Sequence, residues 1–122
     1  MGLFGSASRT AQQIQGDAGE NAALAYLQGQ GLTLVERNFR CKGGEIDLIM
    51  RERQTLVFVE VRKRADARYG GAAASVTHRK QARLILAAQV FLQRHAQQPA
   101  CRFDVIAIDG DKLDWLQNVI EG

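Results

Sequence analysis

The chain has 122 residues, of which 46% are hydrophobic and one is proline, so it can bury a hydrophobic core as a single domain. It contains no run of about 18 consecutive apolar residues and no apolar N-terminal segment, which argues against a membrane span and a secretory signal. The formal net charge is only +3, but residues 37–102 carry fourteen of the sixteen Lys and Arg residues and five of the thirteen Asp and Glu residues, a balance of +9.

The first expected element is a helix from about Thr10 to Gln30. Glu20, Ala23, Leu24 and Leu27 recur at the spacing of one helical face, and two glycines end the pattern. Glu20 therefore shares a stripe with residues that should face the core. Preceding residues have no periodicity, so we expect residues 1–9 to form a flexible tail and residues 10–122 to form a single domain.

Further along the chain, strand-like and helical patterns alternate. Three strands come first, two of them joined as a hairpin by a polar turn; a loop rich in Gly and Ala and a helix that Thr77 caps follow, and two more strands end the chain. The expected ranges are Leu32–Asn38, Glu45–Met50 and Thr55–Lys63 for the first strands, 65–75 for the loop, His78 to about Gln97 for the helix, and Arg102–Ile108 and Lys112–Gln117 for the last strands. The order α-β-β-β-α-β-β predicts an α/β domain with a mixed central sheet flanked by helices.

Acidic residues interrupt the two most strand-like segments. Because side chains alternate between the faces of a strand, Glu45 and Asp47 should share one face, and Ile46, Leu48 and Met50 the other.

In the next strand, Glu60 should share a face with Phe58 and Arg62, whereas Lys63 should point to the opposite face. If the hairpin aligns its acidic faces, Asp47 and Glu60 lie close together and raise each other's pKa.

Two interpretations of these acids remain open at this point. Carboxylate oxygens on a rigid sheet suit a hard cation such as Mg²⁺ or Mn²⁺, which activates water and neutralises charge on a phosphodiester. Alternatively, the acids form a structural ion network with nearby arginines such as Arg40, Arg51 and Arg62. Spacing alone does not separate these interpretations.

A family resemblance favours the first interpretation. The segment GEIDLI, a turn and LVFVEVRKR are preceded by GDAGENAALAYLQGQGLTLVERNFR and followed by a helix that contains Lys80. Over about Gln15 to Ile108, this arrangement closely resembles the bacterial YraN-type family of uncharacterised proteins. That family is similar to the restriction-endonuclease-like, or PD-(D/E)xK, nuclease superfamily and, in layout, to archaeal Holliday-junction resolvases. The resemblance implies a single restriction-endonuclease-like domain.

The resemblance also implies roles for individual residues. Asp47 and Glu60 match the metal-binding acids, and Glu20 matches a further acid that resolvase-like proteins supply from the first helix. Apart from the resemblance, Glu45 lies on the face of Asp47 and so has a supporting role, or, as the first residue of its strand, it points into solvent. As a glutamate in a helix, Glu20 can instead be only a partner for the helix dipole.

Position 62 departs from the motif, because the usual lysine is replaced by Arg62. Arginine can hold a phosphate but stays protonated and cannot act as a general base. Lys63 cannot replace it from the opposite face. Lys80 can supply the missing amine, or it can be an exposed first-turn residue or a phosphate contact.

The uneven charge suggests a polyanionic partner, most simply DNA, although a solvated basic surface is an equal alternative. The expected nucleic-acid contacts are Arg40, Lys42, Arg62, Lys63, Arg64, Arg68, Tyr69, Arg79 and Lys80. Together these features predict a cytoplasmic, metal-dependent endonuclease-like protein that acts on DNA, including branched DNA. Selection of junctions would require two sites at a fixed spacing and hence a homodimer. The alternatives are a nucleic-acid-binding protein that has lost hydrolysis through Arg62, and a structural protein whose acids only form ion pairs.

Overall fold

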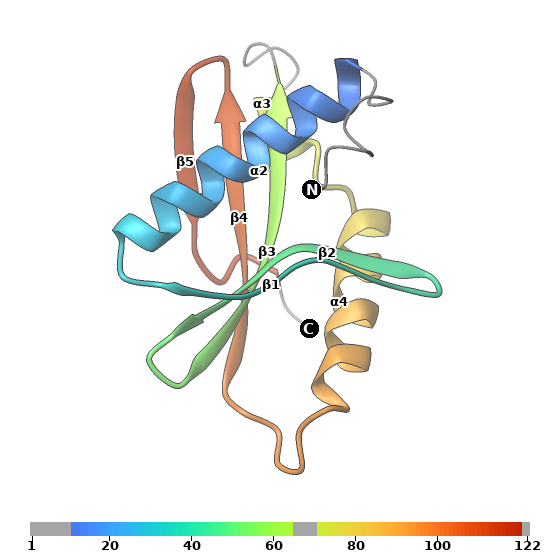
Figure 1. The fold of residues 1–122 in the computed structure, drawn as a ribbon. Helices are drawn as coiled ribbons and strands as arrows, with labels where there is room; N and C mark the ends of the chain where they lie inside the picture. The colour runs from blue at the N-terminus through green and yellow to red at the C-terminus, as the bar shows by residue number, and fades with distance from the viewer. Residues whose placement is uncertain (1–10, 65–70, 121–122) are drawn as a thin grey trace, which may run out of the picture.

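Figure 1 shows the protein as a computed structural model, which describes residues 11–64 and 71–120. Its elements are α2 (Ala11–Gly29), β1 (Thr33–Cys41), β2 (Gly44–Glu52), β3 (Thr55–Arg64), α3 (Gly71–Ala74), α4 (His78–Leu92), β4 (Cys101–Asp109) and β5 (Lys112–Leu116). The predicted order of a helix, three strands, a helix and two strands is confirmed. The short α3 is an addition, because the sequence predicts a loop there. The predicted tail, residues 1–9, lies outside the described residues.

The five strands form one sheet in the order β1-β2-β3-β4-β5. Neighbouring strands are antiparallel except β3 and β4, which are parallel along nine pairs from Leu56↔Cys101 to Arg64↔Asp109. A parallel pair requires a long crossover, which α3 and α4 provide. The mixed sheet is therefore confirmed, and its central strands are the near-continuous apolar runs expected of strands covered on both faces.

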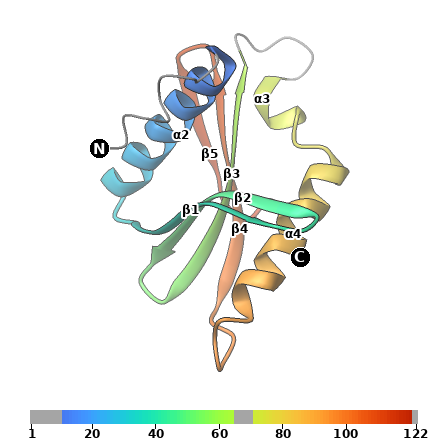
Figure 2. The ribbon, with the colours of Figure 1, turned by 45° about the vertical axis from the view of Figure 1, so that its right-hand side comes forward.

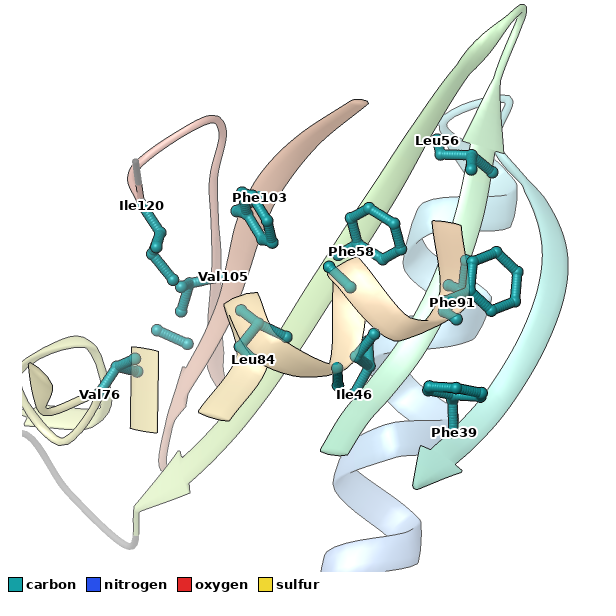
Figure 3. Close-up of a cluster of buried hydrophobic side chains, with 14 of the residues drawn as sticks. Phe39, Ile46, Leu56, Phe58, Val76, Leu84, Phe91, Phe103, Val105 and Ile120 are labelled. Atoms are coloured by element: carbon teal, nitrogen blue, oxygen red, sulfur yellow. The ribbon is translucent and has the colours of Figure 1, made fainter. Parts of the chain in front are cut away.

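Helices cover both faces of this sheet, α2 on one face and α3 with α4 on the other (Figure 2), and each face has its own hydrophobic cluster. On one face, Ala23 and Leu27 of α2 pack in a cluster with Leu48, Val57 and Ile106. On the other face, α4 contributes Leu84, Ala87, Ala88 and Phe91 to a larger cluster around Phe58 and Phe103, shown in Figure 3. Within the described ranges, no helix is long and apolar enough to cross a membrane.

Local hydrogen bonds explain where the helices end. The amide of Leu32 bonds to the Leu27 carbonyl at 3.1 Å across Gly31, whose φ of 97° closes α2 in a glycine-capped turn. The predicted end of α4 at Gln97 is wrong, since the helix stops at Leu92. Beyond it, amides bond three residues back at 3.0–3.2 Å, in a polar segment with little apolar surface to bury.

Strand β1 is longer than predicted, and the hairpin that it forms with β2 is bent. Pairing continues to Cys41↔Gly44, so β1 does not end at Asn38. Asn38 has a φ of 51° and, in this register, lies opposite Asp47, so regular alternation breaks there. As a result, Ile46 packs in the cluster of Ile49 and Phe58, and the prediction that it shares the face of Leu48 is wrong.

The bend brings the tip of the hairpin to α4, as Figures 1 and 2 both show. Gly44 permits this approach, because a Cβ at that position would collide with the Arg83 carbonyl and lie 3.1 Å from Ala87. The hairpin bend and the start of α4 therefore border a common region, in which most of the predicted site residues lie.

Candidate functional site

The centre of the site is a pair of carboxylates, Asp47 and Glu60, at the point where β2 separates from β3. The β2–β3 pairs end at Leu48↔Val59, and the backbone amide of Val61 then donates to Oδ2 of Asp47 at 2.8 Å. The Asp47 side chain thus replaces a strand partner for Val61. The neighbouring Glu60 is only 8% exposed, and its carboxylate lies close enough to Asp47 for the two groups to shift each other's pKa.

Burial dominates the electrostatics of this pair. Burial and then the Asp47 charge raise the pKa of Glu60 to about 8, against the opposing attraction of Arg62. Burial also raises the pKa of Asp47 to about 6, although the Val61 amide favours its charged form. Near pH 7 the two side chains therefore hold about one proton between them, as expected of adjacent carboxylates.

Arg62 lies beside the pair and is anchored at two points. Its Nη1 lies 3.7 Å from Oε2 of Glu60, and its Nε donates to Oγ of Ser75 at 3.1 Å. Lys63 lies on the opposite face, since a Cβ on Gly19 of α2 would lie 3.4 Å from the Lys63 side chain. Lys63 is therefore not positioned to replace the motif lysine.

A cleft of about 390 Å³ opens above Glu60 and Arg62 and is bordered by the first turns of α4. The residues that line it are Glu45, Glu60, Arg62, Thr77, Arg79, Lys80 and Arg83. Burial, and then the charge of Arg62, lower the pKa of Lys80, while Glu60 opposes that shift. Lys80 is thus close enough to respond to both residues.

Glu45 belongs to an ion network at the rim of this cleft. Its carboxylate lies 3.7 Å from Nε of Arg40 and 3.6 Å from Nη2 of Arg83, and its side chain is 46% exposed. The ion-pair interpretation therefore applies to Glu45. It explains the Asp47–Glu60 pair poorly, because Asp47 is held by a backbone amide and Glu60 has only a 3.7 Å contact with Arg62.

Glu20 does not join Asp47 and Glu60 in one set of ligands. It pairs with Nη2 of Arg37 at 3.3 Å, and the same nitrogen donates to Asn21 at 2.8 Å. Across residues 11–64 and 71–120, no three His, Cys, Asp or Glu side chains are close enough together to hold a metal ion. The convergence of three acids is therefore not seen in this arrangement, although the Glu20 charge contributes to the raised pKa of Asp47.

The expected nucleic-acid contacts are divided between several surfaces. Arg62, Arg79 and Lys80 line the cleft, Arg40 reaches its rim through Glu45, and the Arg64 charge acts on Lys80. Lys42 is exposed in the β1–β2 turn. Arg68 and Tyr69 lie outside the described residues.

Two residues of the site were not predicted. Arg83 follows Arg79 and Lys80 by four and three residues, and this spacing on one helix face was a usable signal for a third basic residue. Ser75 carried no such signal, because only folding brings its hydroxyl to Arg62.

The description "Uncharacterised protein family UPF0102" belongs to the family model that matches residues 19–108, a range that includes every residue of the cleft. The chain belongs to this family. It is 69% identical to a UPF0102 protein of Herminiimonas arsenicoxydans over 93% of this chain and 91% of that one. It is 62% identical to one from Janthinobacterium sp. (strain Marseille), covering 93% and 92% of the two chains, and 52% identical to one from Cupriavidus taiwanensis, covering 99% and 93%. Because the UPF0102 description names no activity, function must be argued from the site.

Proposed function

We propose that this UPF0102 protein is a Mg²⁺- or Mn²⁺-dependent endonuclease-like protein that hydrolyses DNA phosphodiesters. One observation carries the proposal: two carboxylates with raised pKa values, the buried Glu60 and the half-buried Asp47, adjoin a cleft lined by four basic side chains. The resemblance to PD-(D/E)xK nucleases points to the same chemistry. Its extension to archaeal Holliday-junction resolvases makes branched DNA the first substrate to test.

The donor set fits a hard divalent cation. Mg²⁺ commonly binds through one or two protein carboxylates, keeps several waters and is completed by substrate phosphate, so a third acid is not required. A cation between Asp47 and Glu60 would favour their charged forms and so oppose both the burial and the charge repulsion that raise their pKa values. When bound, such an ion lowers the pKa of a water molecule and stabilises charge on the phosphodiester.

The basic residues act on the phosphodiester itself. Arg62 donates to phosphate oxygens from the edge of the carboxylate pair. Lys80, with its lowered pKa, contributes a second positive charge from α4. Arg79 and Arg83 hold adjacent backbone phosphates, which accounts for affinity without a sequence preference.

A second candidate function is nucleic-acid binding without hydrolysis. The observation that favours it is Arg62, which replaces the motif lysine and is hydrogen bonded to Ser75. A guanidinium cannot take a proton from water. In this alternative, the cleft and its basic residues serve affinity alone.

Cleavage of labelled DNA separates the two functions. Four-way junction, flap, single-stranded and duplex substrates are incubated with Mg²⁺, Mn²⁺ or EDTA and with wild type, Asp47→Asn and the exposed-acid control Asp114→Asn. Metal-dependent cleavage that is lost only in Asp47→Asn supports the enzyme. Salt-sensitive binding without cleavage in either metal supports the binding protein, and cleavage gained by Arg62→Lys would identify the arginine as the cause. Absence of both cleavage and binding at low salt contradicts both functions.

A further inference from the structure

A chain of hydrogen bonds runs from Arg62 to the far end of the central parallel strands. Nε of Arg62 donates to Oγ of Ser75 at 3.1 Å, and that hydroxyl donates to the Ala72 carbonyl at 2.6 Å. The Ala72 amide in turn donates to Oδ1 of Asp109 at 2.7 Å. Asp109 ends β4 and pairs with Arg64 of β3, so the chain closes on the strand that carries Arg62.

The geometry of α3 is adapted to this chain of contacts. Gly71 has a φ of 74°, and a Cβ there would lie 2.8 Å from Oδ1 of Asp109. Glycine therefore lets the Asp109 carboxylate reach the Ala72 amide. Ser75 is 9% exposed, so its hydroxyl is sheltered from water that would compete for Arg62.

We infer that Ser75 is a positioning residue that holds Arg62 away from Glu60 and over the cleft. This inference rests on the proposed function, in which Arg62 contacts phosphate and Glu60 contacts a cation. The ion pair between Arg62 and Glu60 is long, at 3.7 Å, whereas the bond from Arg62 to Ser75 is 3.1 Å.

The reason for such a restraint lies in the chemistry of arginine. A free guanidinium beside a buried carboxylate closes on it with two parallel hydrogen bonds. Arg62 would then occupy the Glu60 oxygens and withdraw from the phosphate. Because Nε is bonded to Ser75, the fork that uses Nε and Nη2 is not open to Glu60, and the guanidinium meets Glu60 only through Nη1 at 3.7 Å. A lysine has a single ammonium group, so a bond to Ser75 would hold the nitrogen that contacts the phosphate, whereas Arg62 can bond Ser75 through Nε and keep Nη1 and Nη2 for the cleft.

Nuclear magnetic resonance tests the contact between Arg62 and Ser75 and does not depend on DNA cleavage. The Nε–H resonance of Arg62, assigned by its loss in Arg62→Lys, should exchange slowly with water in wild type. In Ser75→Ala, and in the nearly isosteric Ser75→Cys, it should shift and exchange faster, while the hydroxyl control Thr33→Ala leaves it unchanged. An unaltered resonance in a folded Ser75 variant overturns the inference.

A double-mutant cycle tests the functional part. Ser75→Ala should lower kcat/KM for DNA on the order of tenfold, below the roughly 100-fold that a 1 Å misplacement costs. In an Arg62→Lys background, the same change should have an effect of less than about twofold, because its only route is through Arg62. Equal losses in both backgrounds would show a purely structural role and overturn the inference.

Two variants of Asp109, at the other end of this series of hydrogen bonds, form a matched pair. Asp109→Asn keeps the acceptor oxygen and should behave like wild type, whereas Asp109→Ala should repeat the Ser75→Ala effect more weakly. If wild type neither cleaves nor binds DNA, the proposed function fails, and the Arg62 resonance alone then decides whether Ser75 restrains the guanidinium.

Discussion

Replacing Glu60 with glutamine removes one of two neighbouring carboxyl groups while keeping its size and its capacity to hydrogen bond with Asp47. The pKa of Glu60 is raised from 4.5 to about 8, so the folded protein binds a proton more tightly than the unfolded chain does. Proton binding by Glu60 therefore stabilises folded wild type most at low pH, and this contribution to the free energy of unfolding is lost as the pH rises from about 4.5 to about 8. Glutamine does not titrate, so the variant should lack this loss.

The size of the effect follows from the two pKa values. Each pKa unit corresponds to about 1.4 kcal/mol, so Glu60→Gln should be more stable than wild type by up to about 4 kcal/mol at pH 8 without metal. Near pH 4 the two proteins should differ little, because Glu60 is protonated in both folded and unfolded wild type.

Urea unfolding followed by circular dichroism, in EDTA at intervals from pH 4 to pH 9, measures this difference. Asp114→Asn is the control, since it removes an exposed carboxylate that should not alter the slope. Parallel stability profiles for wild type and Glu60→Gln across pH 5–8 would refute the argument that Glu60 is a strained buried acid.

Three further predictions concern the same architecture. Mg²⁺ at 100 times its Kd should raise the unfolding free energy of wild type by about 2.7 kcal/mol and leave that of Asp47→Asn unchanged, as measured by calorimetry. Equal stabilisation of both proteins would show that the ion binds elsewhere. Asp104→Ala should lower the unfolding free energy measured in urea by about 3–5 kcal/mol, because this fully buried carboxylate accepts hydrogen bonds from Arg102, Trp115 and the Asn118 amide. A loss under about 1 kcal/mol would contradict its role as the buried charge partner of Arg102. Gly44→Ala should lower the unfolding free energy by about 1–3 kcal/mol, because the added Cβ collides with α4. Gly29→Ala, whose Cβ would meet nothing within 4 Å, should be neutral or slightly stabilising. Equal melting temperatures of the two variants would argue against the tight contact between the hairpin and α4.

Much of the fold was predictable because it depends on local patterns. Alternating residues identified the β2–β3 hairpin, the Thr77 cap identified the start of α4, and the order of the elements identified a mixed sheet. The same alternation put Glu60 and Arg62 on one face and Lys63 on the other. The spacing of side chains along a regular strand or helix is a property of the backbone, so the sequence carries it.

The details of the site depend on the places where that regularity fails. The positive φ of Asn38 breaks the alternation opposite Asp47, and Ile46 consequently packs with Ile49 and Phe58 instead of on the face of Leu48. Arg37 holds Glu20 apart from the carboxylate pair, and Ser75 meets Arg62 across thirteen positions of sequence. Contacts between distant segments arise from how helices and bent strands pack in three dimensions, and residue spacing along the chain contains no measure of that packing.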